Sequence, residues 1–131
     1  IMREDIEKVL AAMKADYYEW SITRTELTGG FESASARNRA EESVKNYNEG
    51  LTVKENRSYW KIISKKAGGT SVNGFIVKED ETGYRKGKSF KKGDLLMAAG
   101  WNAPARNFER GNLYSSTDFV IKRSCRWTGI G

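Results

Sequence analysis

The stretch VKNYNEGLTVKENRSYWKIIS, residues 44–64, decides the fold, because the spacing of its apolar residues changes part-way along it. Val44, Tyr47 and Leu51 follow one another at intervals of three and four, which is the spacing of one face of an α-helix. Gly50 is typical of a helix C-terminus. From Leu51 onward, the runs LTVKE and SYWKIIS are short and rich in aromatic and β-branched residues, which indicates strands. The sequence therefore predicts a helical part followed by a sheet, an α+β fold.

Upstream of this boundary the sequence predicts two helices, within about residues 3–50. Gly29 and Gly30 separate them, and Ser33 or Ser35 caps the second helix. Two helices joined by so short a turn form an antiparallel hairpin, whose apolar face must cover another surface. That face comprises Ile6, Val9, Leu10, Met13, Tyr17, Trp20 and Leu27 in the first helix, and Ala36, Ala40, Val44, Tyr47 and Leu51 in the second.

The β-rich half, about residues 51–131, contains three further strand-like runs, SVNGFIVKE, DLLMAAGW and STDFVIKRSCRW. In the last run, apolar and polar residues alternate as they do on a half-buried strand. Its apolar set is Phe119, Ile121, Cys125 and Trp127. We therefore expect a single domain in which the helical hairpin packs on a four- to five-stranded, mainly antiparallel sheet. The expected core comprises Trp60, Phe75, Leu95, Phe119, Ile121 and Trp127 from the sheet, and Leu10, Met13 and Trp20 from the first helix.

Two residue types that carry much of enzyme chemistry are scarce in this chain. Its 131 residues include no histidine and one cysteine, which excludes a structural zinc site, a Ser-His-Asp triad and a Cys-His nucleophile within a single chain. A glycine-rich phosphate loop of the GxxxxGKS type is also missing. The sequence thus predicts no catalytic residue, no metal site and no cofactor. Cys125, which lacks a disulfide partner, is expected to be a buried thiol.

Hydropathy predicts no contact with membranes. No apolar run approaches the roughly 20 residues of a membrane-spanning helix. The N-terminal segment IMREDIEKVL lacks the hydrophobic region of a signal peptide. A cytosolic location is the expectation.

Positive charge is concentrated in the β-rich half. Residues 1–57 carry 9 Lys and Arg against 11 Asp and Glu, a net charge of −2, whereas residues 58–131 carry 14 against 6, a net charge of +8. The densest cluster is RKGKSFKK, residues 85–92. A basic surface attracts nucleic acid and other phosphate-bearing ligands. The alternative is that these lysines only solubilise hairpin loops and protect sheet edges from aggregation.

The segment KKGDLLMAAGWNAPARNFERGNLY, residues 91–114, contains the only proline of the chain. Pro104 favours the first turn of a helix, so ARNFER is expected to form one or two helical turns. Arg106 and Arg110 would then share one face, with Phe108 turned inward. Guanidinium groups bind phosphate through paired hydrogen bonds. The candidate phosphate-binding residues are Arg106, Arg110, Lys122, Arg126, Lys86, Lys88, Lys91 and Lys92, and the candidate stacking residues are Trp101 and Tyr84.

Two other charged patterns do not predict sites. The second helix carries several glutamates beside its basic residues, which would make it a poor reader of the DNA major groove. Glu79, Asp80 and Glu81 precede Thr82 and Gly83, and a surface turn explains these acidic residues better than a metal site does.

The string FKKGDLLMAAGWNAPARNFERGNLY, with VNGFIVKED upstream and the ending RWTGIG, resembles small accessory proteins of tailed bacteriophages. The resemblance covers about residues 51–131 and is most specific over residues 92–112. It implies a viral origin and expression in the cytoplasm of a bacterial host, and it carries over no activity and no catalytic residue. Small phage proteins of this kind often act by binding a host protein, a nucleotide signal or nucleic acid.

Three functions follow as hypotheses. The one we favour is a binding module that captures nucleic acid or another phosphate-bearing ligand on the sheet face and the loop of Arg106 and Arg110, with Lys122 and Arg126 adding positive charge. The second is an inhibitor or adaptor that binds a bacterial host protein through a compact patch with little salt dependence. The third is a small enzyme that works without histidine. The oligomeric state is left open.

Overall fold

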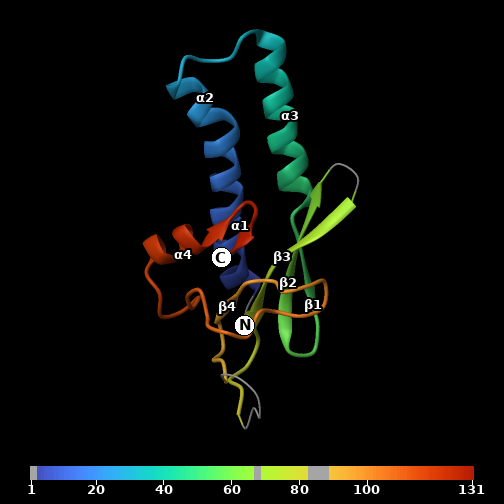
Figure 1. The fold of residues 1–131 in the computed structure, drawn as a ribbon, viewed down its shortest axis with the longest axis vertical. Coiled ribbons are helices and arrows are strands. Elements are labelled where there is room, and N and C mark those ends of the chain that lie inside the picture. Colours follow the sequence, from blue (N-terminus) through green and yellow to red (C-terminus); the bar gives the residue numbers. More distant parts are fainter. Residues whose placement is uncertain (1–2, 67–68, 83–88) are drawn as a thin grey trace.

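A computed structural model of the chain describes residues 3–66, 69–82 and 89–131. Figure 1 shows a tall hairpin of helices above a sheet, with the C-terminal elements packed beside the first helix. The predicted α+β fold is confirmed, since two long helices precede an antiparallel sheet with the strand order β1-β2-β3-β4. The elements are α1 (Arg3–Tyr18), η1 (Glu19–Thr23), α2 (Arg24–Leu27), α3 (Ala34–Gly50), β1 (Thr52–Glu55), β2 (Tyr59–Lys66), β3 (Gly69–Val77), β4 (Leu95–Leu96), α4 (Asp118–Ser124), β5 (Cys125–Arg126) and β6 (Gly129–Ile130).

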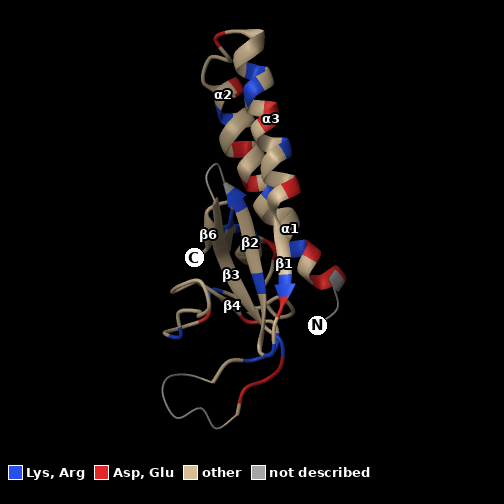
Figure 2. Ribbon diagram, turned by 90° about the vertical axis from the view of Figure 1, so that its right-hand side faces the viewer, with Lys and Arg blue, Asp and Glu red and all other residues tan. Residues whose placement is uncertain are grey.

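The helical hairpin forms at the predicted boundaries. Ser33 Oγ accepts a hydrogen bond from Ala36 N at 3.1 Å, which caps α3 at its N-terminus. At the other end, α3 stops at Gly50, where an added Cβ would lie 2.7 Å from Lys65 Cβ. The glycine therefore lets the end of α3 lie directly against β2. Figure 2 shows basic and acidic positions interspersed along both helices.

The first helix contains a π-helical turn that the sequence pattern did not reveal. Residues Glu19–Thr23 form η1, in which Arg24 N donates a hydrogen bond to Glu19 O. A π turn holds more residues than an α turn, so the residues after it are rotated about the helix axis. Leu27, which follows the turn, is 80 % exposed, and within the turn Ile22 is buried while Trp20 is 49 % exposed. The prediction that Trp20 and Leu27 lie on the buried face was therefore wrong.

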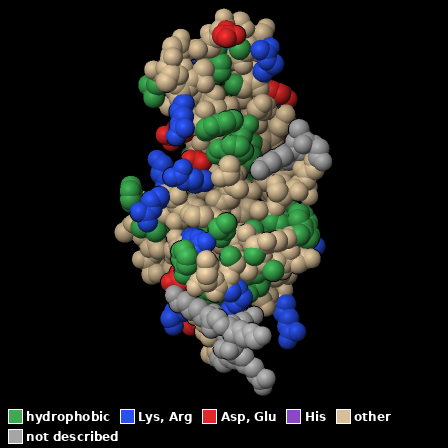
Figure 3. Space-filling view, in the orientation of Figure 1, with side chains coloured by type: hydrophobic (Ala, Val, Ile, Leu, Met, Phe, Trp, Pro, Cys, Tyr) green, Lys and Arg blue, Asp and Glu red, His purple; other side chains and the backbone are tan. Residues whose placement is uncertain are grey.

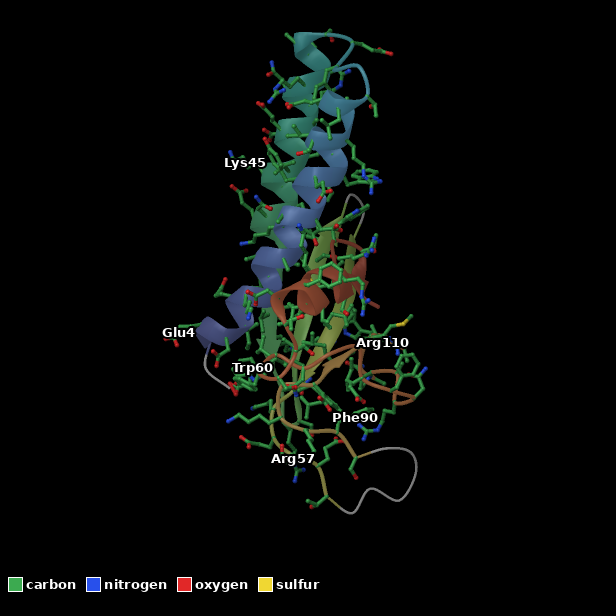
Figure 4. The ribbon with its side chains drawn as sticks, turned by 90° about the vertical axis from the view of Figure 1, so that its left-hand side faces the viewer. Glu4, Lys45, Arg57, Trp60, Phe90 and Arg110 are labelled. Atoms are coloured by element: carbon green, nitrogen blue, oxygen red, sulfur yellow. The ribbon has the colours of Figure 1, made fainter. Side chains whose placement is uncertain are left out.

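The sheet separates two hydrophobic clusters. The larger one lies between the sheet and the helices, and it includes the predicted core residues Leu10, Met13, Leu95 and Ile121, with Trp60 and Trp127 partly buried against it. The smaller one, on the opposite face, comprises Phe75, Val77, Phe90 and Leu96. Phe75 therefore belongs to a second core and not to the shared one. Figure 4 shows Trp60 and Phe90 on opposite sides of the sheet.

The last strand-like run forms a helix instead of a long strand. Thr117 Oγ1 accepts a hydrogen bond from Val120 N at 3.3 Å, and Asp118 lies in the first turn, where a negative charge favours a helix. Ile121 and Cys125 are buried four residues apart, as on a helix face, while Phe119 is 72 % exposed. The prediction of a strand with Phe119 in the core was therefore wrong, and the strand is reduced to the two residues of β5.

A β-bulge in β3 places one polar side chain in the centre of the molecule. Ile62 pairs with Gly74 and Ile63 with Val72, so Asn73 is the extra residue, and only 1 % of it is exposed. Its amide Oδ1 accepts a hydrogen bond from Ser64 Oγ at 2.8 Å, and Nδ2 donates to Tyr47 Oη at 3.3 Å and to Trp127 O at 3.1 Å. Asn73 thus connects β2, α3 and the turn between β5 and β6.

Cys125 is buried, as predicted, and we expect it to react slowly in the folded protein. Burial raises the pKa of its thiol to about 12, so almost no thiolate is present at neutral pH. Labelling by a chromogenic disulfide reagent at pH 8 should be at least about a hundredfold slower than in urea, because it requires local or global unfolding. Equal rates in the two conditions would contradict this placement.

Candidate functional site

The structure distributes the predicted ligand-binding residues over separate regions. Lys86, Lys88 and Tyr84 lie outside the described residues. The others fall into three places: Lys91 and Lys92 before β4, Trp101, Arg106 and Arg110 in the irregular segment after β4, and Lys122 and Arg126 on α4 and β5.

The ARNFER segment is not helical, contrary to the prediction. Pro104 pairs with Ala98 in an isolated β-bridge, and Ala105 N donates to Met97 O at 2.7 Å. These bonds hold the segment in an extended path beside the chain that follows β4, and they replace the helical hydrogen bonds. Arg106 and Arg110 therefore share no helix face, and Phe108 is exposed instead of turned inward.

Arg106 is bound by the protein itself. Its Nη2 lies 2.6 Å from Glu81 Oε1, and its Nη1 donates to Tyr59 Oη at 2.7 Å. Burial alone would raise the pKa of Glu81, but hydrogen bonds from Arg106 and from the Phe90 amide, with the charge of Arg106, outweigh burial and lower that pKa. Both side chains are largely buried. Arg106 thus acts as a structural residue that ties this loop to the chain after β3.

The lysines before β4 lie close to acidic residues. Lys92 N donates to Asp80 Oδ1 at 2.8 Å, and Lys91 N donates to Asp94 Oδ2 at 2.8 Å. Figure 2 shows basic and acidic positions side by side in the chain below the sheet. The exposed charges of Lys91 and Lys92 therefore belong to a region of mixed sign.

Trp101 stacks on a cation of the protein. Lys61 Nζ lies 3.9 Å from the centroid of the Trp101 ring, and only 4 % of Lys61 is exposed. Desolvation, with the neighbouring charge of Lys54, lowers the pKa of Lys61. One face of the Trp101 indole is thus occupied by Lys61. The sequence did not predict this contact, because Lys61 lies forty residues from Trp101 along the chain.

A basic surface remains around α4. We call it the α4 face: the exposed side chains of Lys122, Arg123 and Arg126. None of the three pairs with a carboxylate in the described part of the chain. Arg110 adjoins this face, since Ser124 Oγ donates to Arg110 O at 2.7 Å. Figure 3 shows Lys and Arg side chains on the left of the molecule, beside a hydrophobic group in its upper half.

Four aromatic side chains, one each from α1, η1, α3 and the turn between β5 and β6, form a cluster. Tyr17 stacks on Tyr47 with ring centroids 4.5 Å apart, and the edge of Trp127 contacts Tyr17 at 5.1 Å. Trp20 lies against Trp127 at 4.9 Å. The backbone of Trp127 is fixed as well, because its N donates to Asp16 Oδ2 at 3.0 Å and its O accepts from Tyr47 Oη at 2.9 Å. Trp127 is therefore held in one position.

A cavity of about 260 Å³ opens beside this cluster. We call it the indole cavity. The residues that line it are Asp16, Glu19, Trp20, Arg24, Arg126, Trp127 and Thr128. Asp16 comes from the end of α1, Glu19 and Trp20 from the π turn η1, and Arg24 from the start of α2. Residues 126–128 come from the hairpin of β5 and β6. Of these residues, the sequence pattern indicated only Arg126 as a binding residue, because nothing along the chain connects the two segments.

Comparisons of the chain with protein-family models, with curated proteins and with solved structures find no match. The resemblance to phage accessory proteins therefore stays a prediction. Within the described ranges, no three His, Cys, Asp or Glu side chains gather as metal ligands, and no helix is long and apolar enough to cross a bilayer.

Proposed function

We propose that the protein binds single-stranded nucleic acid through the indole cavity and the α4 face. The observation that carries the proposal is the half-exposed Trp20, which lies against the fixed ring of Trp127 in a cavity that Arg24 and Arg126 also line. Bases stack on indole rings whatever their sequence, and guanidinium groups bind phosphates. The cavity thus combines the two kinds of contact that an unpaired nucleotide requires.

The α4 face extends the positive charge away from the cavity. Arg126 belongs to both, and Lys122 and Arg123 continue the charge along α4. A strand whose base enters the cavity can therefore place its neighbouring phosphates on these side chains. Because the aromatic cluster already fixes Trp127, binding does not have to order that ring, which favours affinity.

A single strand suits this surface better than a duplex. Stacking on Trp20 and Trp127 requires a base that is free of its own stack. The long helices α1 and α3 carry charges of both signs, which suits the major groove of a duplex poorly (Figure 2). If the phage resemblance holds, we propose the cytoplasm of the bacterial host as the place of binding.

Host-protein binding is the second candidate, and one observation favours it. Leu27 and Tyr18 are exposed on the helical hairpin, and Leu27 is 80 % exposed. An apolar contact there would depend little on salt, whereas strand binding falls steeply as salt increases. Salt dependence therefore discriminates between the two functions.

The proposal is tested by the affinity for a labelled twelve-residue oligothymidylate, measured by fluorescence anisotropy at several salt concentrations. The triple variant Lys122→Gln, Arg123→Gln and Arg126→Gln should bind at least about tenfold more weakly at about 50 mM salt. The slope of log affinity against log salt concentration should fall in magnitude by about 2, because each phosphate contact on a single strand contributes about 0.7 to that slope.

The matched control removes the same charge elsewhere. Arg39→Gln, Lys45→Gln and Lys54→Gln change exposed residues on α3 and β1, away from the cavity. This variant should lose much less affinity than the α4 variant. Equal losses in both variants, or no binding of the wild-type protein at about 50 mM salt, would overturn the proposal, and the host-protein hypothesis would then lead.

A further inference from the structure

The indole cavity has carboxylates in its wall as well as arginines, and phosphate binding does not explain them. Asp16 and Glu19 line it together with Arg24 and Arg126. A site for phosphate alone would repel its ligand with these acidic groups. A ligand that bears both an anionic group and a set of hydrogen-bond donors fits the two signs of charge together.

The two carboxylates differ in how far the protein already uses them. Asp16 Oδ2 accepts a hydrogen bond from Trp127 N at 3.0 Å, so Asp16 positions the indole. The Glu19 carboxylate forms no hydrogen bond or ion pair with another described residue, and it is exposed. Glu19 precedes Trp20 in the chain and begins the π turn. π turns interrupt helices frequently at functional sites. Glu19 is thus the carboxylate of the cavity that keeps both of its oxygens available.

An ionised carboxylate only accepts hydrogen bonds, so it selects among the bases. Guanine has two donors side by side on its Watson–Crick edge, N1–H and N2–H, which the two oxygens of one carboxylate can accept together. On adenine and cytosine, a ring nitrogen with a lone pair lies beside the exocyclic amine, and on thymine carbonyl oxygens flank N3–H. A carboxylate therefore cannot form the paired hydrogen bonds with these bases, which bind in the cavity through stacking alone. The paired hydrogen bonds between a carboxylate and the guanine edge are charge-assisted, and such bonds are stronger than those between neutral groups.

The size of the cavity agrees with a single planar base. Its volume of about 260 Å³ lies just below the roughly 300–1,000 Å³ of pockets that bury drug-sized ligands. Trp20 and Trp127, tilted by 36° to each other, supply the aromatic wall. Arg24 and Arg126 are available for the phosphate of the same nucleotide.

We propose that the indole cavity is a guanine nucleotide subsite, in which Glu19 accepts the two donors of the guanine edge while the base stacks against the aromatic wall that Trp20 and Trp127 form. This inference deepens the proposed function and rests on it, because it takes the guanine nucleotide to be part of a bound single strand. The same chemistry would also bind a free guanine nucleotide, so the experiment includes both sources.

The first arm of the test uses mononucleotides and follows the indole N–H resonance of Trp20 by NMR. Deoxyguanosine monophosphate should bind at least about fivefold more tightly than deoxyadenosine monophosphate, because a good bidentate contact discriminates by about 1–3 kcal/mol. Glu19→Gln should abolish this preference, since its amide presents one donor and one acceptor. Glu42→Gln, which removes the same charge from an exposed position on α3, should preserve it.

The second arm uses twelve-residue oligothymidylates that carry one central guanine or one central adenine. The wild-type protein should prefer the guanine strand, and Glu19→Gln should bind both strands equally. If the wild-type protein binds both strands equally and shows no preference among mononucleotides, the guanine subsite is overturned, while the proposed strand binding stands. If the protein prefers the guanine mononucleotide but binds no strand, the strand proposal fails, and the subsite stands as a site for free nucleotides.

Discussion

Replacing Asn73 by alanine is expected to lower the free energy of unfolding by about 3–5 kcal/mol. The change removes an amide that accepts from Ser64 Oγ and donates to Tyr47 Oη and Trp127 O. It leaves the buried Ser64 hydroxyl without its acceptor and opens a cavity between β3 and α3. Each buried polar group left unsatisfied costs about 1–3 kcal/mol, and the cavity adds to that cost.

Urea denaturation, followed by tryptophan fluorescence and by circular dichroism, measures this loss. The matched control is Asn38→Ala, an exposed asparagine on α3, which should change stability by less than about 0.5 kcal/mol. A loss below about 1 kcal/mol for Asn73→Ala would show that the network contributes little, because water or a rearranged Ser64 satisfies the same groups.

The Asn73 network also supports the candidate site. Asn73 and Tyr47 both donate to the carbonyl of Trp127, whose ring forms the fixed wall of the indole cavity. We therefore expect folded Asn73→Ala protein to bind the oligothymidylate less tightly than the wild-type protein does, although Asn73 itself does not line the cavity. The bulge in β3 thus links the stability of the fold to the position of the binding surface.

The sequence predicted the helical hairpin well because its signals are local. Ser33 and Gly50 mark the ends of α3 through their own backbone preferences, and the apolar spacing of Ile6, Val9 and Met13 corresponds to a face that is buried. The change of period after Gly50 predicted the start of the sheet for the same reason. These features need no knowledge of what the segments contact.

The errors arose where tertiary contacts override local signals. The segment 118–124 alternates like a strand, but its cap at Thr117 and its burial of Ile121 and Ser124 correspond to a helix. Pro104 suits a helix start, yet the chain around it bonds to residues 97–99 instead. In both places two local patterns competed, and long-range packing decided between them.

The candidate site could be predicted only in part. The positive charge of Lys122 and Arg126 was visible in the sequence, and both residues are exposed as a binding role requires. Trp20, Glu19 and Arg24 were not predicted as binding residues, because the π turn that rotates them and the hairpin that meets them have no signature along the chain.

Arg106→Met is expected to destabilise the protein by about 2–4 kcal/mol and to leave oligothymidylate affinity unchanged. The variant keeps an unbranched apolar side chain but loses the guanidinium, whose Cζ lies 4.7 Å from the centroid of the Phe90 ring, and it leaves the largely buried carboxylate of Glu81 without its charged partner. Breaking one side of a buried ion pair is costly for this reason. The matched control is Arg37→Met, whose ion pairs with Glu26 and Glu41 are exposed and should contribute much less. If folded Arg106→Met protein bound the strand more weakly than the wild-type protein, Arg106 would have to be part of the binding surface, contrary to this expectation.

The pH dependence gives an independent measurement of the same pair. The pKa of Glu81 is lowered from its ordinary value of 4.5, so the pair contributes stability above that pH and loses it as the pH falls through the lowered value. The double variant Glu81→Leu with Arg106→Met removes both charges, and it should be less destabilised than the two single changes predict together, by at least about 1 kcal/mol. It should also lose less stability than the wild-type protein between pH 5 and pH 3. If the two single losses are additive and the acid dependence is unchanged, the pair does not hold the loop, and the neutral contacts of this loop with Tyr59 and Phe90 must hold it instead.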